Sequence, residues 1–196
     1  MPRPGDRRPL ITDHAIAVLA DGGARVLPHQ AVDRHAGLAA GSTSYYFRTR
    51  QALVEAVVER IRHHSRAAFE DARSQAEEPV TVEGAAELIA GQLGHLADGR
   101  RDQALAVFAL LGEVREHREL RQSLMRCLFS VELAAGLFRS LGSDSPQADA
   151  ADLVDLLTGR LVGMLFGDGD LLPEQVRETV ARFVRRCAGG YAGATT

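Results

Sequence analysis

Hydrogen-bond donors are concentrated in one short segment near the start of the chain. Residues 41–50, GSTSYYFRTR, are rich in hydroxyl groups, contain no acidic residue and carry Arg48 and Arg50 at their end. Hydroxyl and guanidinium groups are typical donors to the phosphate oxygens of nucleic acids. The sequence contains no lysine, so any cationic contact with a phosphate must use an arginine, whose guanidinium can bind bidentately. The segment is therefore a candidate phosphate-binding site.

Residue combinations typical of catalysis or metal binding do not occur in the sequence. No two histidines have the i, i+4 spacing that places two metal ligands on one helix face, and no nucleophile elbow or phosphate loop is present. Cys127 and Cys187 each lie in an apolar helical pattern, which indicates small buried side chains and not the exposed, electropositive thiols of redox sensors. We expect no enzymatic activity, no metal and no cofactor.

Charge is unevenly distributed along the chain. The 196 residues carry a formal net charge of −3 and are 45% apolar, which is normal for a soluble globular protein. Residues 1–50 contain seven arginines and four aspartates, a balance of +3, and the remaining 146 residues have a balance of −6. A basic end on an acidic body fits a small head that faces nucleic acid. Chance asymmetry in a protein of this size is the alternative.

No segment has the pattern of a targeting or membrane element. Asp13 and His14 follow the N-terminal arginines, so the apolar core of a signal peptide is not present. No apolar run approaches the ~20 residues that a membrane span needs. Two cysteines make no disulfide framework, which fits a reducing compartment. We expect a cytoplasmic protein that has no membrane partner.

The donor-rich segment belongs to a predicted helix-turn-helix. Apolar residues at helical spacing predict a first helix from Pro9 to Ala20. A second short helix is expected to end at Gly37, because glycine tolerates the positive φ of a sharp turn between helices. Residues 41–47 then form a third short helix. Three compact helices with a glycine at the turn are typical of a helix-turn-helix unit.

Beyond this head, the apolar periodicity predicts only helices. A long helix over residues 50–76 ends at Glu77-Glu78-Pro79. The later helices are expected at 82–98, 101–115, 118–141, 147–166 and 173–188. The predicted fold class is all-α. An N-terminal arm and three-helix head occupy residues 1–50, a long helix continues to about residue 77, and a larger helical body occupies residues 78–196.

Residues 10–57 resemble the DNA-binding domain of the TetR family of transcriptional regulators. The family pattern A-G-[VL]-x-x-G-[ST]-x-x-Y-x-F-x-[ST]-[KR]-x-x-L stands here as AGLAAGSTSYYFRTRQAL, from Ala36 to Leu53. The sequence departs from the usual pattern at Pro28, Ala39 and Ser44. The resemblance implies that the head binds DNA and that the diverged body, residues 78–196, binds small ligands and dimerises.

The resemblance also assigns roles to individual residues of the head. Tyr45, Tyr46 and Arg50 are expected to contact the DNA backbone, because phenol hydroxyls and guanidinium groups donate to phosphate oxygens. A second set lies where base edges could be reached: Gln30, Ala40, Ser42, Thr43 and Ser44. The alternative for Tyr45 or Tyr46 is packing within the three-helix core, to which we assign Phe47 outright.

The last two predicted helices are expected to form the interface of a homodimer. Val176, Val180 and Val184 are part of an apolar stripe on the final helix, and the helix at 147–166 is apolar nearly all round. A twin subunit could cover the second side of such a helix in a four-helix bundle. Burial within a monomer is the alternative.

The body also contains apolar residues that could line a ligand pocket: Phe108, Leu111, Leu128, Phe129, Phe138, Met164 and Phe166. Such residues are more often plain core. A pocket would be mainly apolar with a few polar groups, such as Glu113, Glu132 or Arg160.

The resemblance, together with these observations, implies a ligand-responsive transcriptional regulator, specifically a repressor. It would bind a pseudo-palindromic double-stranded operator as a homodimer, and a mainly apolar small-molecule effector would release it. The alternative is a helical small-molecule-binding or interaction protein whose head does not bind an operator. The net charge of −3 and the departure at Pro28 keep that alternative open.

Overall fold

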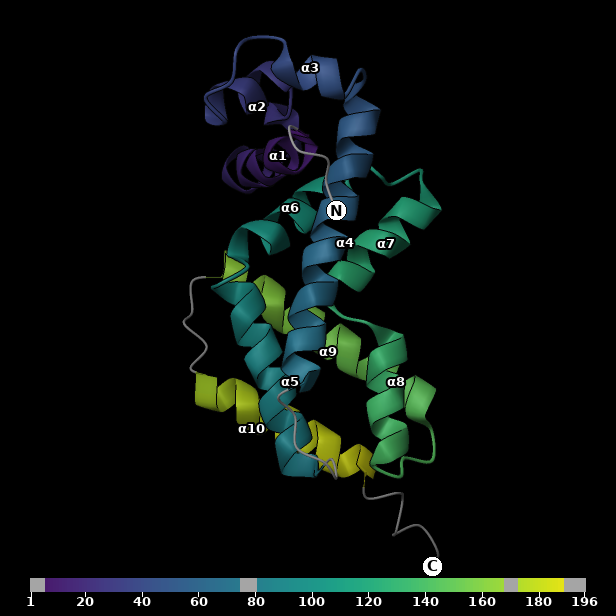
Figure 1. The fold of residues 1–196 in the computed structure, drawn as a ribbon. Coiled ribbons are helices and arrows are strands. Elements are labelled where there is room, and N and C mark those ends of the chain that lie inside the picture. Colours follow the sequence, from purple (N-terminus) through teal and green to yellow (C-terminus); the bar gives the residue numbers. More distant parts are fainter. Residues whose placement is uncertain (1–5, 75–80, 168–172, 189–196) are drawn as a thin grey trace, which may run out of the picture. The chain divides into compact units, whose positions relative to one another are not determined.

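The computed structural model describes residues 6–74, 81–167 and 173–188, and all regular structure in these ranges is helical, which confirms the predicted all-α class (Figure 1). The helices are α1 (Arg8–Gly22), η1 (Ala24–Val26), α2 (His29–His35), α3 (Ser42–Tyr46), α4 (Arg50–Ser74), α5 (Val82–Ala97), α6 (Arg101–Leu111), α7 (Arg118–Leu128), α8 (Val131–Ser140), α9 (Pro146–Phe166) and α10 (Pro173–Ala188). No helix in the described ranges has the length and apolar character to cross a membrane.

The chain divides into two compact units. The first contains the described residues of Met1–Ala67 and Arg100–Leu128, and the second those of Ala68–Gly99 and Phe129–Thr196. The first unit therefore combines the predicted head with α6 and α7. The predicted boundary between residues 77 and 78 lies outside the described residues.

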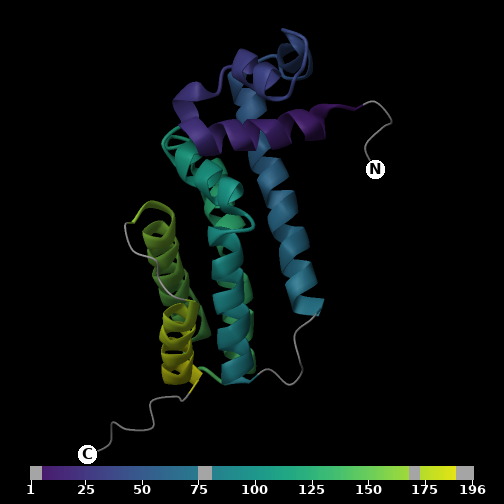
Figure 2. The ribbon, with the colours of Figure 1, turned by 90° about the vertical axis from the view of Figure 1, so that its left-hand side faces the viewer.

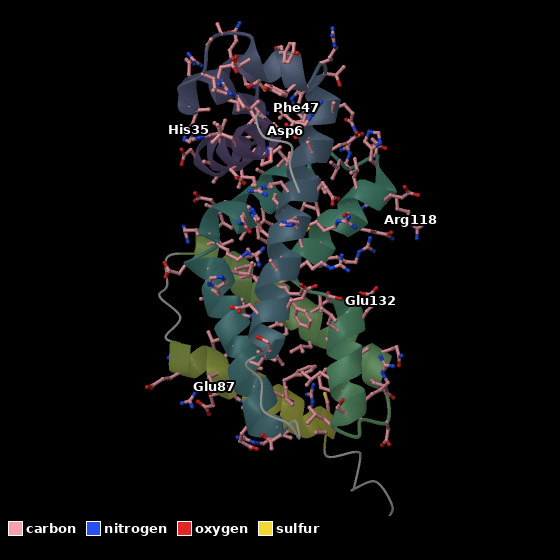
Figure 3. All side chains as sticks on the ribbon, viewed as in Figure 1. Asp6, His35, Phe47, Glu87, Arg118 and Glu132 are labelled. Carbon is pink, nitrogen blue, oxygen red and sulfur yellow. The ribbon has the colours of Figure 1, made fainter. Side chains whose placement is uncertain are left out.

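The first unit is built on α1, which packs against α2 and α6 (Figure 2). Its apolar face, with Ile11, Ala15 and Leu19, is fully buried, as the helical spacing predicted. Phe47, between α3 and α4, is also in the core, as predicted (Figure 3). Burial of such faces stabilises these helices more than their intrinsic propensity does.

One predicted helix is wrong. The expected single helix over residues 118–141 is divided into α7 and α8. Ser130 has extended backbone, and its side chain accepts a hydrogen bond from the Leu133 N–H at 3.3 Å. A serine in this position caps a new helix. The apolar repeat continues across the break, so periodicity alone did not reveal it.

The second unit consists of α5, α8, α9 and α10 with the last residues of α4. Within it α10 packs against α5, and α8 packs against α9. Thr81 caps α5 by accepting a hydrogen bond from the Gly84 N–H at 3.0 Å. The predicted stripe Val176, Val180 and Val184 is buried. Its partner in this chain is α5, since that is the helix against which α10 lies.

Candidate nucleic-acid interface

The helix-turn-helix is formed by α2, a turn and α3. Gly37 has φ 62° and Gly41 has φ 88°, so both ends of the turn use the left-handed region that glycine adopts at little cost. This confirms the turn predicted at Gly37. The helix α3 has only five residues, too few to be stable by itself. Its position must come from contacts with neighbouring elements.

Asp33 of α2 anchors the start of α3. Its carboxylate accepts hydrogen bonds from the Gly41 N–H at 2.8 Å, the Thr43 N–H at 2.8 Å and the Thr43 hydroxyl at 2.6 Å. Gly41, the N-cap residue of α3, has no side chain that could accept these donors. Asp33 supplies the acceptor that the first turn of a helix needs. The sequence pattern does not indicate this role, because Asp33 lies eight residues before Gly41, the N-cap residue of α3.

The carboxylate of Asp33 is only 3% exposed. Burial raises the pKa of Asp33, but the hydrogen bonds from Thr43 and Gly41, together with nearby His29, outweigh burial and hold the pKa below its usual value. Asp33 is therefore charged near neutral pH, and its charge is used within the turn.

A second contact fixes the far end of α3. The His29 imidazole lies 2.7 Å from the Phe47 carbonyl oxygen, through its Nε2 atom. The ring nitrogen donates, because a carbonyl only accepts. The first residue of α2 is thus bonded to the residue that follows α3. Asp33 and His29 together hold both ends of the short helix.

The structure places most of the predicted base-reading residues on the surface of the head. Gln30, Ala40 and Ser44 are exposed, and Ser42 is half-buried with its hydroxyl bonded to the Ala39 carbonyl at 2.6 Å.

Thr43 requires a correction. It is fully buried and its hydroxyl donates to Asp33, so it has no free surface for a base edge. Thr43 positions α3.

The two tyrosines form an aromatic cluster with Arg8, a residue outside the predicted set of DNA contacts. Tyr45 is 77% exposed, which excludes the alternative that it packs in the core. Its ring meets Tyr46 edge-on with centroids 5.2 Å apart, and the Arg8 guanidinium lies 5.7 Å from the Tyr46 ring centroid. Arg8 is the first residue of α1, 38 positions away. The cluster offers phenol and guanidinium donors on one patch.

Arg50, the third predicted backbone contact, is engaged within the protein. Its Nη1 atom lies 2.5 Å from the Glu113 carboxylate, and its Nη2 atom donates to the Ala24 carbonyl at 2.9 Å. Glu113 follows α6, so Arg50 joins the start of α4 to the end of α6 and to η1. The sequence offers Glu113 as a polar residue of a ligand pocket, whereas in the structure its carboxylate binds Arg50 at the start of α4.

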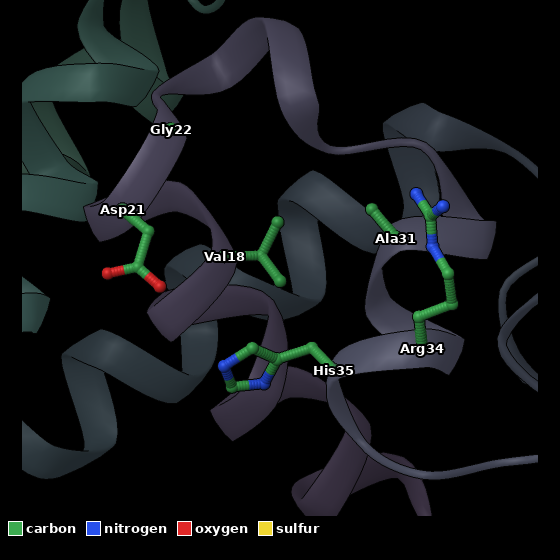
Figure 4. A pocket seen from close by; sticks show the side chains of 6 residues that line it. All are labelled: Val18, Asp21, Gly22, Ala31, Arg34 and His35. Atoms are coloured by element: carbon green, nitrogen blue, oxygen red, sulfur yellow. The ribbon is translucent and has the colours of Figure 1, made fainter.

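The head also contains an open groove of about 430 Å³ between α1 and α2 (Figure 4). Its lining residues are Val18, Asp21, Gly22, Ala31, Arg34 and His35. The Nδ1 atoms of His35 and His14 lie 2.9 Å apart, so one ring donates to the other and links α2 to α1. None of the predicted DNA-contacting residues lines this groove.

The predicted pocket residues are divided between the two units. Phe108, Leu111 and Leu128 belong to the first, whereas Phe129, Phe138 and Met164 belong to the second. Phe138 is fully buried and meets Phe183 edge-on at 6.3 Å, which makes it part of the core of its unit. Phe166 also belongs to the second unit. The six pocket residues other than Phe138 remain predictions.

The first unit contains a buried cation near the start of α6. Arg100 is 8% exposed, and its guanidinium donates to Ser65 Oγ at 2.5 Å and to Gln103 Oε1 at 2.7 Å. Burial lowers the pKa of Arg100. Ser65 in turn donates to the Cys127 carbonyl at 2.7 Å, so this network links α4, α6 and α7. Burial raises the pKa of Cys127 to about 11, which agrees with an unreactive thiol.

Comparison with known proteins identifies relatives of both the body and the whole chain. Residues 80–189 match the family model described as "Tetracyclin repressor-like, C-terminal domain". The chain is similar to the structure of the multidrug binding protein EbrR complexed with ethidium, with 25% identity, a TM-score of 0.68, and coverage of 91% of this chain and 98% of that one.

Two further similar structures belong to proteins described as TetR-family or TetR-like. A TetR-family member from Streptomyces coelicolor A3 has 23% identity and a TM-score of 0.70, with 91% and 98% of the two chains covered. A TetR-like transcriptional regulator from Rhodococcus sp. RHA1 has 18% identity and a TM-score of 0.67, with 96% and 99% covered. At these identities the likeness establishes the fold. No curated protein matches the chain.

Proposed function

The chain belongs to the TetR family of transcriptional regulators, which are not enzymes, and on that premise we propose that it is a repressor that binds a pseudo-palindromic operator as a homodimer. Two copies of α3 would enter successive major grooves, about 34–36 Å apart. A mainly apolar small molecule would release the operator. The site of action would be the cytoplasm.

The observation that carries the proposal is the exposed surface around α3. Tyr45 projects from a helix whose two ends are fixed by Asp33 and His29, beside Tyr46 and Arg8. Donors held on a rigid element suit phosphate contacts, because phosphate contacts set the register of a protein on DNA. Ala40 and Ser44 would then face base edges, where an alanine methyl group can pack against a thymine methyl group.

The proposed homodimer would form through the last two helices, α9 and α10. Most of the apolar contact between the two subunits would be made by α9. Exposed positions of α9 recur at Ala151, Asp155, Gly159, Val162 and Phe166, on one face of the helix. Val162 is 40% exposed and Phe166 is 59% exposed. The apolar stripe of α10 is already buried in this chain, which favours the monomer-burial alternative for that stripe. An isologous contact through α9 would cover Val162 and Phe166.

Effector release requires that the small molecule bind one state of the protein more tightly than another. The similarity to EbrR, a multidrug binding protein complexed with ethidium, supports an effector with a large apolar surface. Such a molecule would favour a dimer whose heads are wrongly spaced for two successive grooves.

The experiment is a DNA-binding titration of the full chain. Genomic fragments are selected with the purified protein, and the recovered operator is titrated in fluorescence anisotropy. Tyr45→Phe combined with Arg50→Ala should weaken binding by about tenfold or more at moderate salt, since each change removes a backbone contact. Gln51→Ala, an exposed change beside Arg50 in sequence, is the control. Undiminished affinity in the double variant would refute the assigned contacts.

The second candidate function is a helical small-molecule-binding protein without operator binding. It is favoured by the engagement of Arg50 with Glu113. A salt titration separates the two. An operator-binding protein loses affinity steeply as salt rises, whereas a protein of the second kind leaves the duplex unbound even at low salt.

A further inference from the structure

The Arg50 guanidinium has two fixed partners within the first unit. The Glu113 carboxylate binds one terminal nitrogen at 2.5 Å, and the Ala24 carbonyl accepts from the other at 2.9 Å. The three residues come from α4, the turn after α6, and η1. A guanidinium has five N–H groups, and the contacts with Glu113 and Ala24 use one on each terminal nitrogen, so fewer donors remain for a phosphate. Because the Glu113 carboxylate also offsets the charge of the guanidinium, phosphate binding at Arg50 is weaker while the contact with Glu113 is in place.

Glu113 is held by backbone contacts at the end of α6. Its N–H donates to the Leu110 carbonyl at 3.0 Å, and α6 packs against both α1 and η1. The position of the carboxylate therefore follows the position of the last turn of α6. Arg50 and Glu113 are 63 residues apart in sequence. The pair therefore links α4 to the turn after α6, two elements that are distant along the chain.

The pair is suited to exchange. The side chains of Arg50 and Glu113 are 43% and 35% exposed. Exposed ion pairs are weak and screened by salt, so a phosphate can displace the carboxylate. The DNA phosphate and the Glu113 carboxylate both carry negative charge, however, and two anions at one guanidinium repel each other. Binding of one must disfavour binding of the other.

We propose that Glu113 competes with a DNA phosphate for Arg50, so that the end of α6 regulates the DNA affinity of the head. This inference rests on the proposed function. A shift of α6 that withdraws Glu113 frees Arg50 and strengthens DNA binding. A shift that holds Glu113 against Arg50 keeps the guanidinium occupied and weakens it.

The test compares the full chain with Glu113→Gln on a fluorescein-labelled, random-sequence DNA duplex. The variant should bind about fivefold more tightly at low salt, and its plot of log affinity against log salt concentration should steepen by about 0.9, as expected for one additional phosphate contact. Glu113→Asp draws the carboxylate back by one methylene and should give an intermediate affinity, although the net charge of the chain is unchanged.

Glu116→Gln is the matched control. Glu116 lies in the same turn, its side chain is 81% exposed, and it pairs with its neighbour Arg115. The substitution changes net charge by the same amount, so it should reproduce only the general effect of charge. In an Arg50→Gln background, Glu113→Gln should raise affinity no more than Glu116→Gln does.

The outcomes separate the inference from the function on which it rests. If the wild-type chain binds the duplex but Glu113→Gln matches Glu116→Gln, the competition is refuted and the proposed function stands. The same holds if, in the Arg50→Gln background, Glu113→Gln still raises affinity more than Glu116→Gln does. If Glu113→Gln weakens binding, Glu113 orients Arg50 for DNA and the competition is likewise refuted. If no variant binds at low salt while circular dichroism shows folded helices, the proposed function fails together with the inference.

Discussion

In the helix-turn-helix, α3 is held in place mainly by hydrogen bonds, whereas α10 is held against α5 mainly by apolar packing. In the first, Asp33 and His29 bind the ends of the five-residue α3 through hydrogen bonds to backbone groups. In the second, sixteen-residue helices pack with buried apolar side chains, and two ion pairs between the helices, Arg177–Glu87 and Arg185–Glu83, lie at exposed positions on the rim. A short helix has too little surface for apolar burial, so polar anchors must replace it.

The largest effect is expected where apolar packing dominates. Phe138→Ala removes a fully buried ring that meets Phe183 of α10, and it should lower the free energy of unfolding by about 3–5 kcal/mol. Urea unfolding followed by circular dichroism measures the loss. Leu133→Ala, on the same helix but 46% exposed, should cost less than about 1 kcal/mol. Equal losses in both variants would contradict the assignment of Phe138 to the core.

The second largest effect on stability is expected at Asp33, the polar anchor of α3. Asp33→Ala leaves the Gly41 and Thr43 N–H groups without their acceptor, and it should lower the free energy of unfolding by about 2–3 kcal/mol. Amide hydrogen exchange should rise first at α3. Asp21→Ala, an exposed aspartate on α1, is the control and should change stability by less than about 0.5 kcal/mol.

The charge of Asp33 also makes this anchor dependent on pH. Because its pKa is lowered in the folded protein, its stabilising contribution is present above the unfolded value of about 3.9 and is lost as pH falls through the folded pKa. The difference in unfolding free energy between the wild type and Asp33→Asn should therefore shrink as pH falls from neutral to about 3. A difference that stays constant over this range would show that the charge is not involved.

A smaller change isolates one hydrogen bond of the anchor. Thr43→Val keeps the shape of the buried side chain but removes the hydroxyl that donates to Asp33. The free energy of unfolding should fall by about 1–2 kcal/mol. Operator affinity should change less in Thr43→Val than in Tyr45→Phe, because Thr43 has no surface for DNA. The reverse order would restore Thr43 as a contact residue.

The smallest effect is expected at the rim of the α5–α10 pair. The ion pair between Arg177 and Glu87 spans 3.6 Å with side chains 55% and 70% exposed. Arg177→Gln should change stability by less than about 0.5 kcal/mol, and less still at high salt. A larger loss would mean that ion pairs as well as apolar contacts hold α10 in place.

This contrast also explains how far the sequence could predict the structure. Apolar spacing identified α1, α4 and α10, because burial of a helix face leaves a period in the sequence. The turn at Gly37 was also predictable, since few other residues adopt its backbone conformation. The break at Ser130 was missed because the apolar repeat continues across it. Local pattern decided each of these cases.

The predictions for the site were less complete, because its contacts are long-range. Asp33 binds groups eight and ten residues away, Arg8 reaches Tyr46, and Glu113 reaches Arg50 across 63 residues. The spacing of apolar residues along the sequence contains no information about such long-range pairs. The exposed positions Gln30, Ala40, Ser44 and Tyr45 came from the family resemblance, which says where a residue lies and nothing about what holds it there.

The anchoring of α3 has a consequence for how this protein could acquire new targets. The groups that fix the helix, Asp33, Thr43 and His29, are different from the exposed side chains that would read bases. Substitutions at Ala40 or Ser44 therefore leave the anchors intact. Under the proposed function, target preference could therefore change in evolution or by design without loss of the folded head. The anchoring residues would fix the position of α3, while the exposed residues on it could be replaced.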